Sequence, residues 1–175
     1  CFPVALDRVS PHLINATIAA EDQRFYDHDG VDRHAIVRAV WQNVTNASIR
    51  SGASTITMQL VKLADDLPRS VPGKAEQAAR ALQLERHASK DRILEAYLNR
   101  AAYGYNLLGC EAASKRFFGK SAAELTLSEA ALLAALPKAP SALNPVNQPD
   151  RARARRDYVL DRMCEEALIS IDDAE

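Results

Sequence analysis

The sequence has little cysteine, no long hydrophobic run and no excess of either charge, and each absence excludes a class of protein. The three cysteines, Cys1, Cys110 and Cys164, are an odd number without metal-ligand spacing, which excludes a complete disulfide framework. No apolar stretch approaches the roughly 20 residues of a membrane-spanning helix, and no signal peptide is visible. The 22 basic and 23 acidic residues give a formal net charge of −1, which argues against a nucleic-acid partner.

The composition that is present is that of an ordinary globular protein, with 47% hydrophobic and 26% charged residues in a chain of 175. This length favours a single domain over residues 1–175 with a core of its own. The chain opens with Cys1-Phe2-Pro3 and no methionine. We therefore expect a segment excised from a longer protein.

Apolar residues recur with helical spacing in almost every segment, and no alternating strand pattern is visible. The pattern predicts helices over residues 11–21, 32–44, 54–63, 74–87, 89–98, 111–118, 126–136 and 150–168. Several open with a capping residue, such as Ser10 before Pro11 and Thr126 with Glu129. Residues 65–73 contain Pro68, Pro72 and Gly73, which predicts a mobile loop. The expected fold is mainly α.

Glu21 and Asp22 close the first predicted helix, which is apolar over its last turns except for Thr17. A carboxylate there that faces a partly desolvated cleft has a raised pKa and is a better general base near neutral pH. Neighbouring helical residues diverge by about 100°, so Glu21 and Asp22 cannot share that role. A solvated helix end with local caps accounts for the same residues equally well.

Two further segments carry groups suited to an anion. Glycine and hydroxyl residues open the predicted helix at 54–63, and Gln59 and Lys62 lie three residues apart on one face of it. Lys74 and Gln77 share a face of the next helix, and Arg69 lies in the loop before it. Lys62, Arg69 and Lys74 together would suit a diphosphate. For each residue alone, ordinary capping or a solvated charged face is the alternative.

Five segments occur in the order and spacing of a known family. They are Glu21-Asp-x-x-Phe-x-x-His-x-Gly, Gly52-Ala-Ser-Thr-Ile-Thr-Met-Gln, the helix that begins at Lys74, Ile93-Leu-Glu-x-Tyr-Leu-Asn99, and Glu129-Ala-Ala-Leu-Leu-Ala-Ala-Leu-Pro-Lys-Ala-Pro140. From about Val4 to Arg162 the chain resembles glycosyltransferase family 51, the peptidoglycan glycosyltransferase domain of class A penicillin-binding proteins. The resemblance implies a lysozyme-like helical domain with a small mobile flap or jaw region at residues 65–73.

The chain departs from the family pattern at two places. Met58-Gln59 stands where the family usually has Gln-Gln, and Gly73-Lys74-Ala75-Glu76-Gln77 stands where it usually has Arg-Lys-x-x-Glu. Gln77 thus replaces the family's second carboxylate. At both places the chain resembles the penicillin-binding protein 1C type.

The resemblance implies a transferase that polymerises lipid II into glycan strands, with inversion at the anomeric carbon and release of undecaprenyl diphosphate. By motif position Glu21 is the catalytic base. The implied substrate-binding residues are Ser54, Gln59, Lys62, Arg69, Lys74 and Gln77. No cofactor is obligatory, and Asp22 is the expected ligand if a divalent metal ion, Mg²⁺ or Mn²⁺, binds.

The implied partners are lipid II, the growing glycan strand, the membrane surface, phosphoglycolipid inhibitors of the moenomycin type and other cell-wall synthesis proteins, and no nucleic acid. The implied location is the outer, periplasmic face of the bacterial cytoplasmic membrane, with the anchor outside this chain. Two alternatives stay open. One is a lytic, glycan-cleaving enzyme on the same fold, and the other is a non-catalytic or weakly active module that binds lipid II or glycan.

Overall fold

A computed structural model describes residues 2–38, 54–65 and 70–174. The predicted substrate-binding residue Arg69 and the last part of the predicted helix at 32–44 lie outside these ranges. The elements are η1 (Leu6–Arg8), α1 (Pro11–Glu21), η2 (Phe25–Asp27), α3 (Ile56–Asp65), α4 (Val71–Glu85), α5 (Lys90–Arg100), α6 (Cys110–Phe118), η3 (Ala122–Glu124), α7 (Leu127–Ala135), η4 (Leu136–Lys138), α8 (Pro149–Glu165) and α9 (Ile171–Ala174). Residues 33–38 are also helical. The described residues contain no strand, only an isolated bridge between Ala102 and Leu108, which confirms the mainly α prediction.

Local signals placed most helix ends correctly. Thr126 and Glu129 form the predicted capping box of α7. Asp32 accepts the backbone N–H groups of His34 and Ala35 at 2.8 and 3.0 Å, as predicted for a cap. Ser10 precedes α1, but its hydroxyl donates to the Leu125 carbonyl at 3.0 Å and makes no cap bond.

The predicted loop over residues 65–73 is wrong at its end, because α4 begins at Val71 and not at Lys74. Ser70 is the N-cap and accepts the Gly73 N–H, and Pro72 lies in the first turn, where its missing N–H has no helical partner to lose. Helix α8 likewise begins at Pro149, one residue before the predicted cap Asp150.

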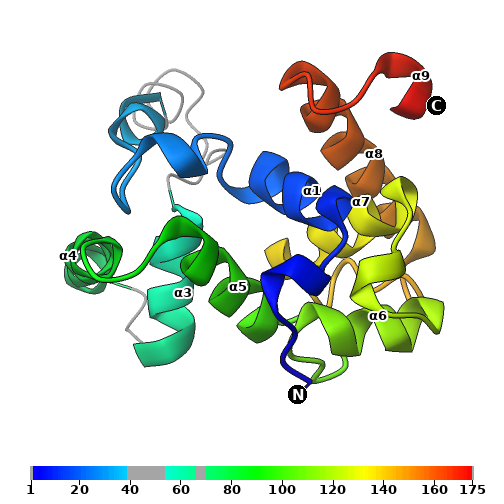
Figure 1. Cartoon of the computed structure of the whole chain (residues 1–175), viewed down its shortest axis with the longest axis horizontal. Coiled ribbons are helices and arrows are strands. Elements are labelled where there is room, and N and C mark those ends of the chain that lie inside the picture. The colour runs from blue at the N-terminus through cyan, green and yellow to red at the C-terminus, as the bar shows by residue number, and fades with distance from the viewer. Residues whose placement is uncertain (1, 39–53, 66–69, 175) are drawn as a thin grey trace.

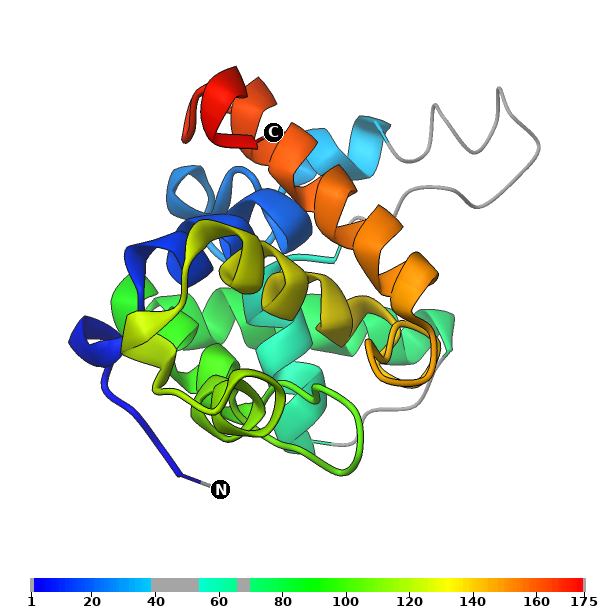
Figure 2. The same ribbon diagram turned by 90° about the vertical axis from the view of Figure 1, so that its right-hand side faces the viewer.

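The helices divide into two groups that meet along α1 and α5. In Figure 1, α3 and α4 lie on one side and α6, α7 and α8 on the other. Helix α7 packs against α1 and α8, and α3 packs against α4 and α5. Figure 2 shows α8 running along one flank of the molecule toward the C-terminus. The C-terminal end of α1, where Glu21 lies, therefore faces both groups.

One main core joins both groups, and its largest fully buried side chains include Tyr97, Tyr103, Phe25, Leu13, Ile56, Ile93 and Leu133. A smaller cluster of Met58, Val61 and Ala81 lies between α3 and α4. The N-terminal segment is bound to α5, where Asn99 exchanges two hydrogen bonds with the Val4 backbone and Glu95 accepts the Leu6 N–H. Two polar residues of the 93–99 motif thus stabilise the fold.

Candidate active site

Glu21 is the last residue of α1, and its two carboxylate oxygens have different surroundings. Oε2 accepts a hydrogen bond from Gln59 Nε2 at 2.8 Å. Oε1 is buried and has no hydrogen-bond partner among the described residues. Glu21 lines a cavity of about 120 Å³ together with Ser54, Tyr158 and Arg162. One oxygen is therefore bonded to the fold, and the other has room for a donor that none of the described residues supplies.

A second hydrogen bond, at the carbonyl oxygen of its amide, orients Gln59. Tyr97 of α5 donates its hydroxyl to Gln59 Oε1 at 3.3 Å, so the Gln59 Nε2 donor must point toward Glu21. Tyr97 is fully buried, and burial raises the pKa of its phenol well above 10. The chain Tyr97–Gln59–Glu21 thus connects α5, α3 and α1 through one amide.

The electrostatics of Glu21 suit a general base. Burial is the largest effect and raises the pKa of its carboxyl, while the Gln59 hydrogen bond and the charges of Lys138 and Arg155 lower the pKa. The neighbouring Asp22 charge raises the pKa further. The raised pKa makes Glu21 a stronger proton acceptor than an exposed carboxylate, as the sequence predicted.

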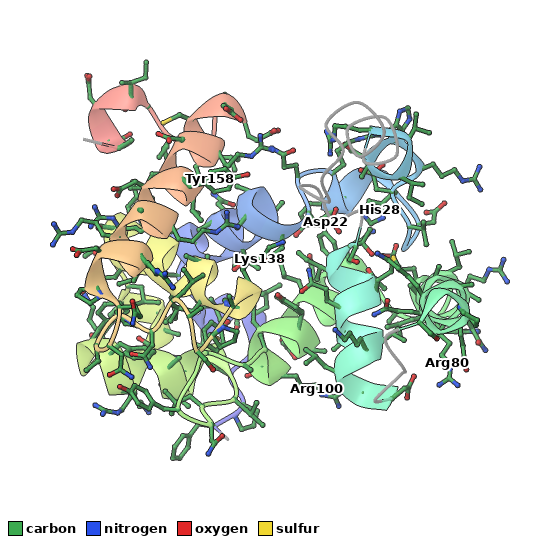
Figure 3. All side chains as sticks on the ribbon, turned by 180° about the vertical axis from the view of Figure 1, so that it is seen from behind. Asp22, His28, Arg80, Arg100, Lys138 and Tyr158 are labelled. Atoms are coloured by element: carbon green, nitrogen blue, oxygen red, sulfur yellow. The ribbon has the colours of Figure 1, made fainter. Side chains whose placement is uncertain are left out.

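Asp22 connects three segments. Both of its oxygens lie 3.0 Å from His28 Nε2, and Oδ2 also accepts the Ile56 N–H at 2.9 Å, at the start of α3. His28 Nδ1 accepts the Gly30 N–H at 3.1 Å, which assigns the ring proton to Nε2 and makes His28 the donor to Asp22. Figure 3 shows Asp22 and His28 next to each other at the end of α1.

This geometry does not fit a metal site at Asp22. The carboxylate already accepts bonds from His28 and from the backbone, and the described residues contain no group of three His, Cys, Asp or Glu side chains that could bind a metal ion. Binding of a divalent metal ion by Asp22 stays a prediction.

Gly30 shows why the first motif ends in glycine. Its φ is +96°, and a Cβ built there would lie 2.7 Å from the Ala81 carbonyl oxygen of α4. Its own carbonyl accepts the Thr55 hydroxyl at 2.7 Å. A side chain at this position would force α4 away from the segment after α1.

The predicted anion-binding residues are placed differently from one another. Ser54 lines the Glu21 cavity, and Gln59 bonds to Glu21. Lys62 on α3 and Lys74 on α4 are exposed and form no ion pair with any residue that the structure describes. These two lysines are available to an external anion.

Gln77 points away from the solvent that Lys74 faces. Its side chain is buried, and Nε2 donates to the Met58 carbonyl of α3 at 2.8 Å. The amide therefore stabilises the contact between α4 and α3 with a bond that an ionised carboxylate could not donate. Both departures from the family pattern, Met58 and Gln77, meet at this bond.

Sequence reasoning missed the groups that α8 and η4 bring to Glu21. Lys138 and Arg155 act on its pKa, and Tyr158 and Arg162 line its cavity. The Arg155 guanidinium lies 4.3 Å from the Tyr158 ring centroid, and its Nε is buried without a described partner. Positions 155, 158 and 162 are three and four apart and so share a helix face, a signal that was present in the sequence.

Comparison with known proteins identifies this arrangement. The family model described as "Transglycosylase" matches residues 2–164. The chain belongs to the transglycosylase family. It is 48% identical over 97% of its length to penicillin-binding protein 1C of Escherichia coli K12 and 46% identical over 97% to penicillin-binding protein 1A of Aquifex aeolicus. These matches cover 22% and 23% of the two relatives, so the chain spans under a quarter of their length.

The transglycosylase fold is supported by a solved structure. Penicillin-binding protein 1A from Haemophilus influenzae matches 99% of this chain and 16% of its own, with a TM-score of 0.59 and 31% identity. The predictions of the family and of a lysozyme-like helical fold are thereby confirmed. The similarity to the 1C type is consistent with Met58 and Gln77.

Proposed function

We propose that this transglycosylase domain polymerises lipid II, with Glu21 as the base that takes the proton from the attacking hydroxyl. The observation that carries the proposal is the unequal pair of oxygens on Glu21. Gln59 binds Oε2 and leaves the buried Oε1 as the proton acceptor. The 4-hydroxyl of the acceptor sugar would donate to Oε1 as its oxygen attacks.

The reaction balances with one proton transfer and one leaving group. The acceptor oxygen forms a bond to the anomeric carbon of the donor from the face opposite the diphosphate, which inverts that centre. The bond from that carbon to the diphosphate oxygen breaks, and its electron pair leaves with the lipid diphosphate. The proton stays on Glu21. The exposed Lys62 and Lys74, with Arg69, would neutralise the growing charge on the diphosphate.

The geometry favours transfer over hydrolysis. A lytic enzyme usually needs a second carboxylate that activates water or attacks the sugar. Two other carboxylates line the Glu21 cavity, Asp22 and Asp32, and both are committed to the fold. Asp22 accepts from His28 and Ile56, and Asp32 caps residues 33–38 and lies 3.6 Å from Arg24.

The setting of the reaction is part of the proposal. Among the described residues no helix is long and apolar enough to cross a membrane. The lipid substrate would bring the domain to the outer face of the cytoplasmic membrane. Phosphoglycolipid inhibitors of the moenomycin type would compete for the diphosphate-binding lysines, and other cell-wall synthesis proteins would act beside the domain.

Separate incubations with lipid II and with finished peptidoglycan test the proposal. We expect polymeric glycan from lipid II and no cleavage of the finished polymer, with Glu21→Gln as the inactive control. Soluble fragments from peptidoglycan would support the lytic alternative. Tight binding of lipid II without polymer would support the binding module.

A further inference from the structure

A second group of buried charges lies outside the cavity, where α4 ends and α5 begins. Glu85 is the last residue of α4 and Lys90 the first residue of α5, and their side chains are only 5% and 20% exposed. Lys90 Nζ lies 2.7 Å from Glu85 Oε2.

Helix electrostatics do not explain why the pair is there. The C-terminal end of a helix disfavours an anion such as Glu85, and the N-terminal end disfavours a cation such as Lys90. Burial of an ion pair is also weak evidence of a gain in stability, because both charges lose hydration. The two charges therefore occupy positions that neither their own helices nor the solvent favours.

Each member of the pair has a second bond to a segment that carries the active site. Glu85 Oε1 accepts the hydroxyl of Thr57, in the first turn of α3, at 2.5 Å. Lys90 Nζ donates to the His28 carbonyl at 2.5 Å and lies 4.6 Å from the centroid of the Phe25 ring. Thr57 and Phe25, one contact of each charged residue, are fully buried.

The two bonds reach segments next to the two partners of the Gln59–Glu21 hydrogen bond. On one side Thr57 lies two residues before Gln59, the donor to Glu21. On the other side His28 binds both oxygens of Asp22, the residue directly after Glu21. Asp22 and His28 are labelled close to each other in Figure 3. The pair thus connects the segment after α1 to the start of α3 independently of the Asp22–Ile56 bond.

We propose that Glu85 and Lys90 are positioning residues that keep Glu21 and Gln59 at bonding distance. This inference rests on the proposed function of Glu21. The pair touches no substrate, and it acts by preventing the end of α1 from moving relative to α3. Misplacement of a reacting group by about 1 Å can lower a rate by about 10²-fold.

The decisive variant is Lys90→Met with Glu85→Gln, tested in lipid II polymerisation. Lys90→Met alone leaves an unpaired buried carboxylate and is expected to be unstable. The double variant removes both charges, and its new amide can still bind Thr57, so we expect its melting temperature to recover. The His28 carbonyl has still lost its donor, so we expect kcat to fall about tenfold to hundredfold with KM nearly unchanged. The single variant Lys90→Arg, with Glu85 unchanged, keeps a cation and N–H donors. It should therefore retain most of the kcat that the double variant loses.

A matched control is Lys120→Met with Glu129→Gln. This pair has an N–O distance of 2.6 Å, and glutamine preserves the capping box of α7. We expect its kcat to equal that of the parent. An equal loss of kcat in the control, or a folded Lys90/Glu85 double variant with parental kcat, would overturn the inference. A parent chain that makes no polymer would instead refute the proposed function.

Discussion

The residues around Glu21 are bonded to one another, whereas Lys62 and Lys74 extend into solvent without an ion pair to any described residue. Gln59, Tyr97, Asp22 and His28 connect α1, α3 and α5 through short hydrogen bonds. The Glu21 carboxylate is therefore oriented before substrate binds. The lysines keep the freedom to follow an anion, at the entropic cost of ordering two long side chains on binding. The difference indicates a rigid proton acceptor beside an adaptable diphosphate site.

The largest effect on the polymerisation rate is expected at Glu21. Glu21→Gln preserves the shape of the side chain and removes its basicity, so we expect polymerisation to fall about 10²- to 10⁴-fold. Lipid II binding should be nearly unchanged, because the oxygen of the new amide can still accept from Gln59 and its NH2 group has the size of the Oε1 that it replaces. Initial rates of glycan formation measure the effect. A folded variant that polymerises at the parental rate would exclude Glu21 as the base.

At the exposed lysines we expect a smaller effect, which is a loss of affinity for the anionic ligand. Lys74→Ala should weaken a moenomycin-type phosphoglycolipid about 10- to 100-fold, the range for one charge-assisted hydrogen bond. Titration calorimetry measures the dissociation constant. Lys115→Ala, which removes an exposed lysine of α6, is the matched control and should bind as the parent does. Equal affinities of all three proteins would remove Lys74 from the diphosphate site.

The pH dependence of the polymerisation rate tests the raised pKa of Glu21. Burial raises the pKa of Glu21 above its ordinary 4.5, and Glu21 must be ionised to accept a proton. The rate should therefore fall about tenfold per unit as pH drops below that raised pKa. Arg155→Gln removes a charge that lowers the pKa of Glu21, so its acid limb should lie at higher pH. An acid limb that is the same in both proteins would contradict this effect of Arg155.

The smallest effect on rate is expected at Gln77, which lies on the helix of Lys74 and bonds to α3, the helix of Gln59. Gln77→Glu places a carboxylate opposite the Met58 carbonyl, which should lower the free energy of unfolding by about 1–3 kcal/mol at neutral pH. Protonation should reverse the loss at low pH, and Gln77→Met, which lacks the charge, should not show this reversal. Thermal denaturation across pH measures the difference. Unchanged stability with a new dependence on Mg²⁺ would instead support the role beside the cations that the sequence suggested.

The fold and the burial of Glu21 could be predicted because their signals are local. Helical spacing and capping residues marked α1 and α7, and the apolar run before Glu21 indicated burial. The direction of Gln77 could not be predicted, because helix periodicity groups Lys74 with Gln77 but does not say which of them faces α3. The approach of Lys138 and Arg155 depends on how η4 and α8 lie relative to α1, which no local pattern specifies.

The unbonded oxygen of Glu21 also has a consequence for thermal stability. Because the folded state has the higher pKa, the contribution of Glu21 to stability is fully present below its unfolded pKa. That contribution is lost as pH rises through the folded pKa. At neutral pH the ionised side chain therefore makes the native state easier to unfold than an uncharged one would. Selection for reactivity at this position opposes selection for heat resistance.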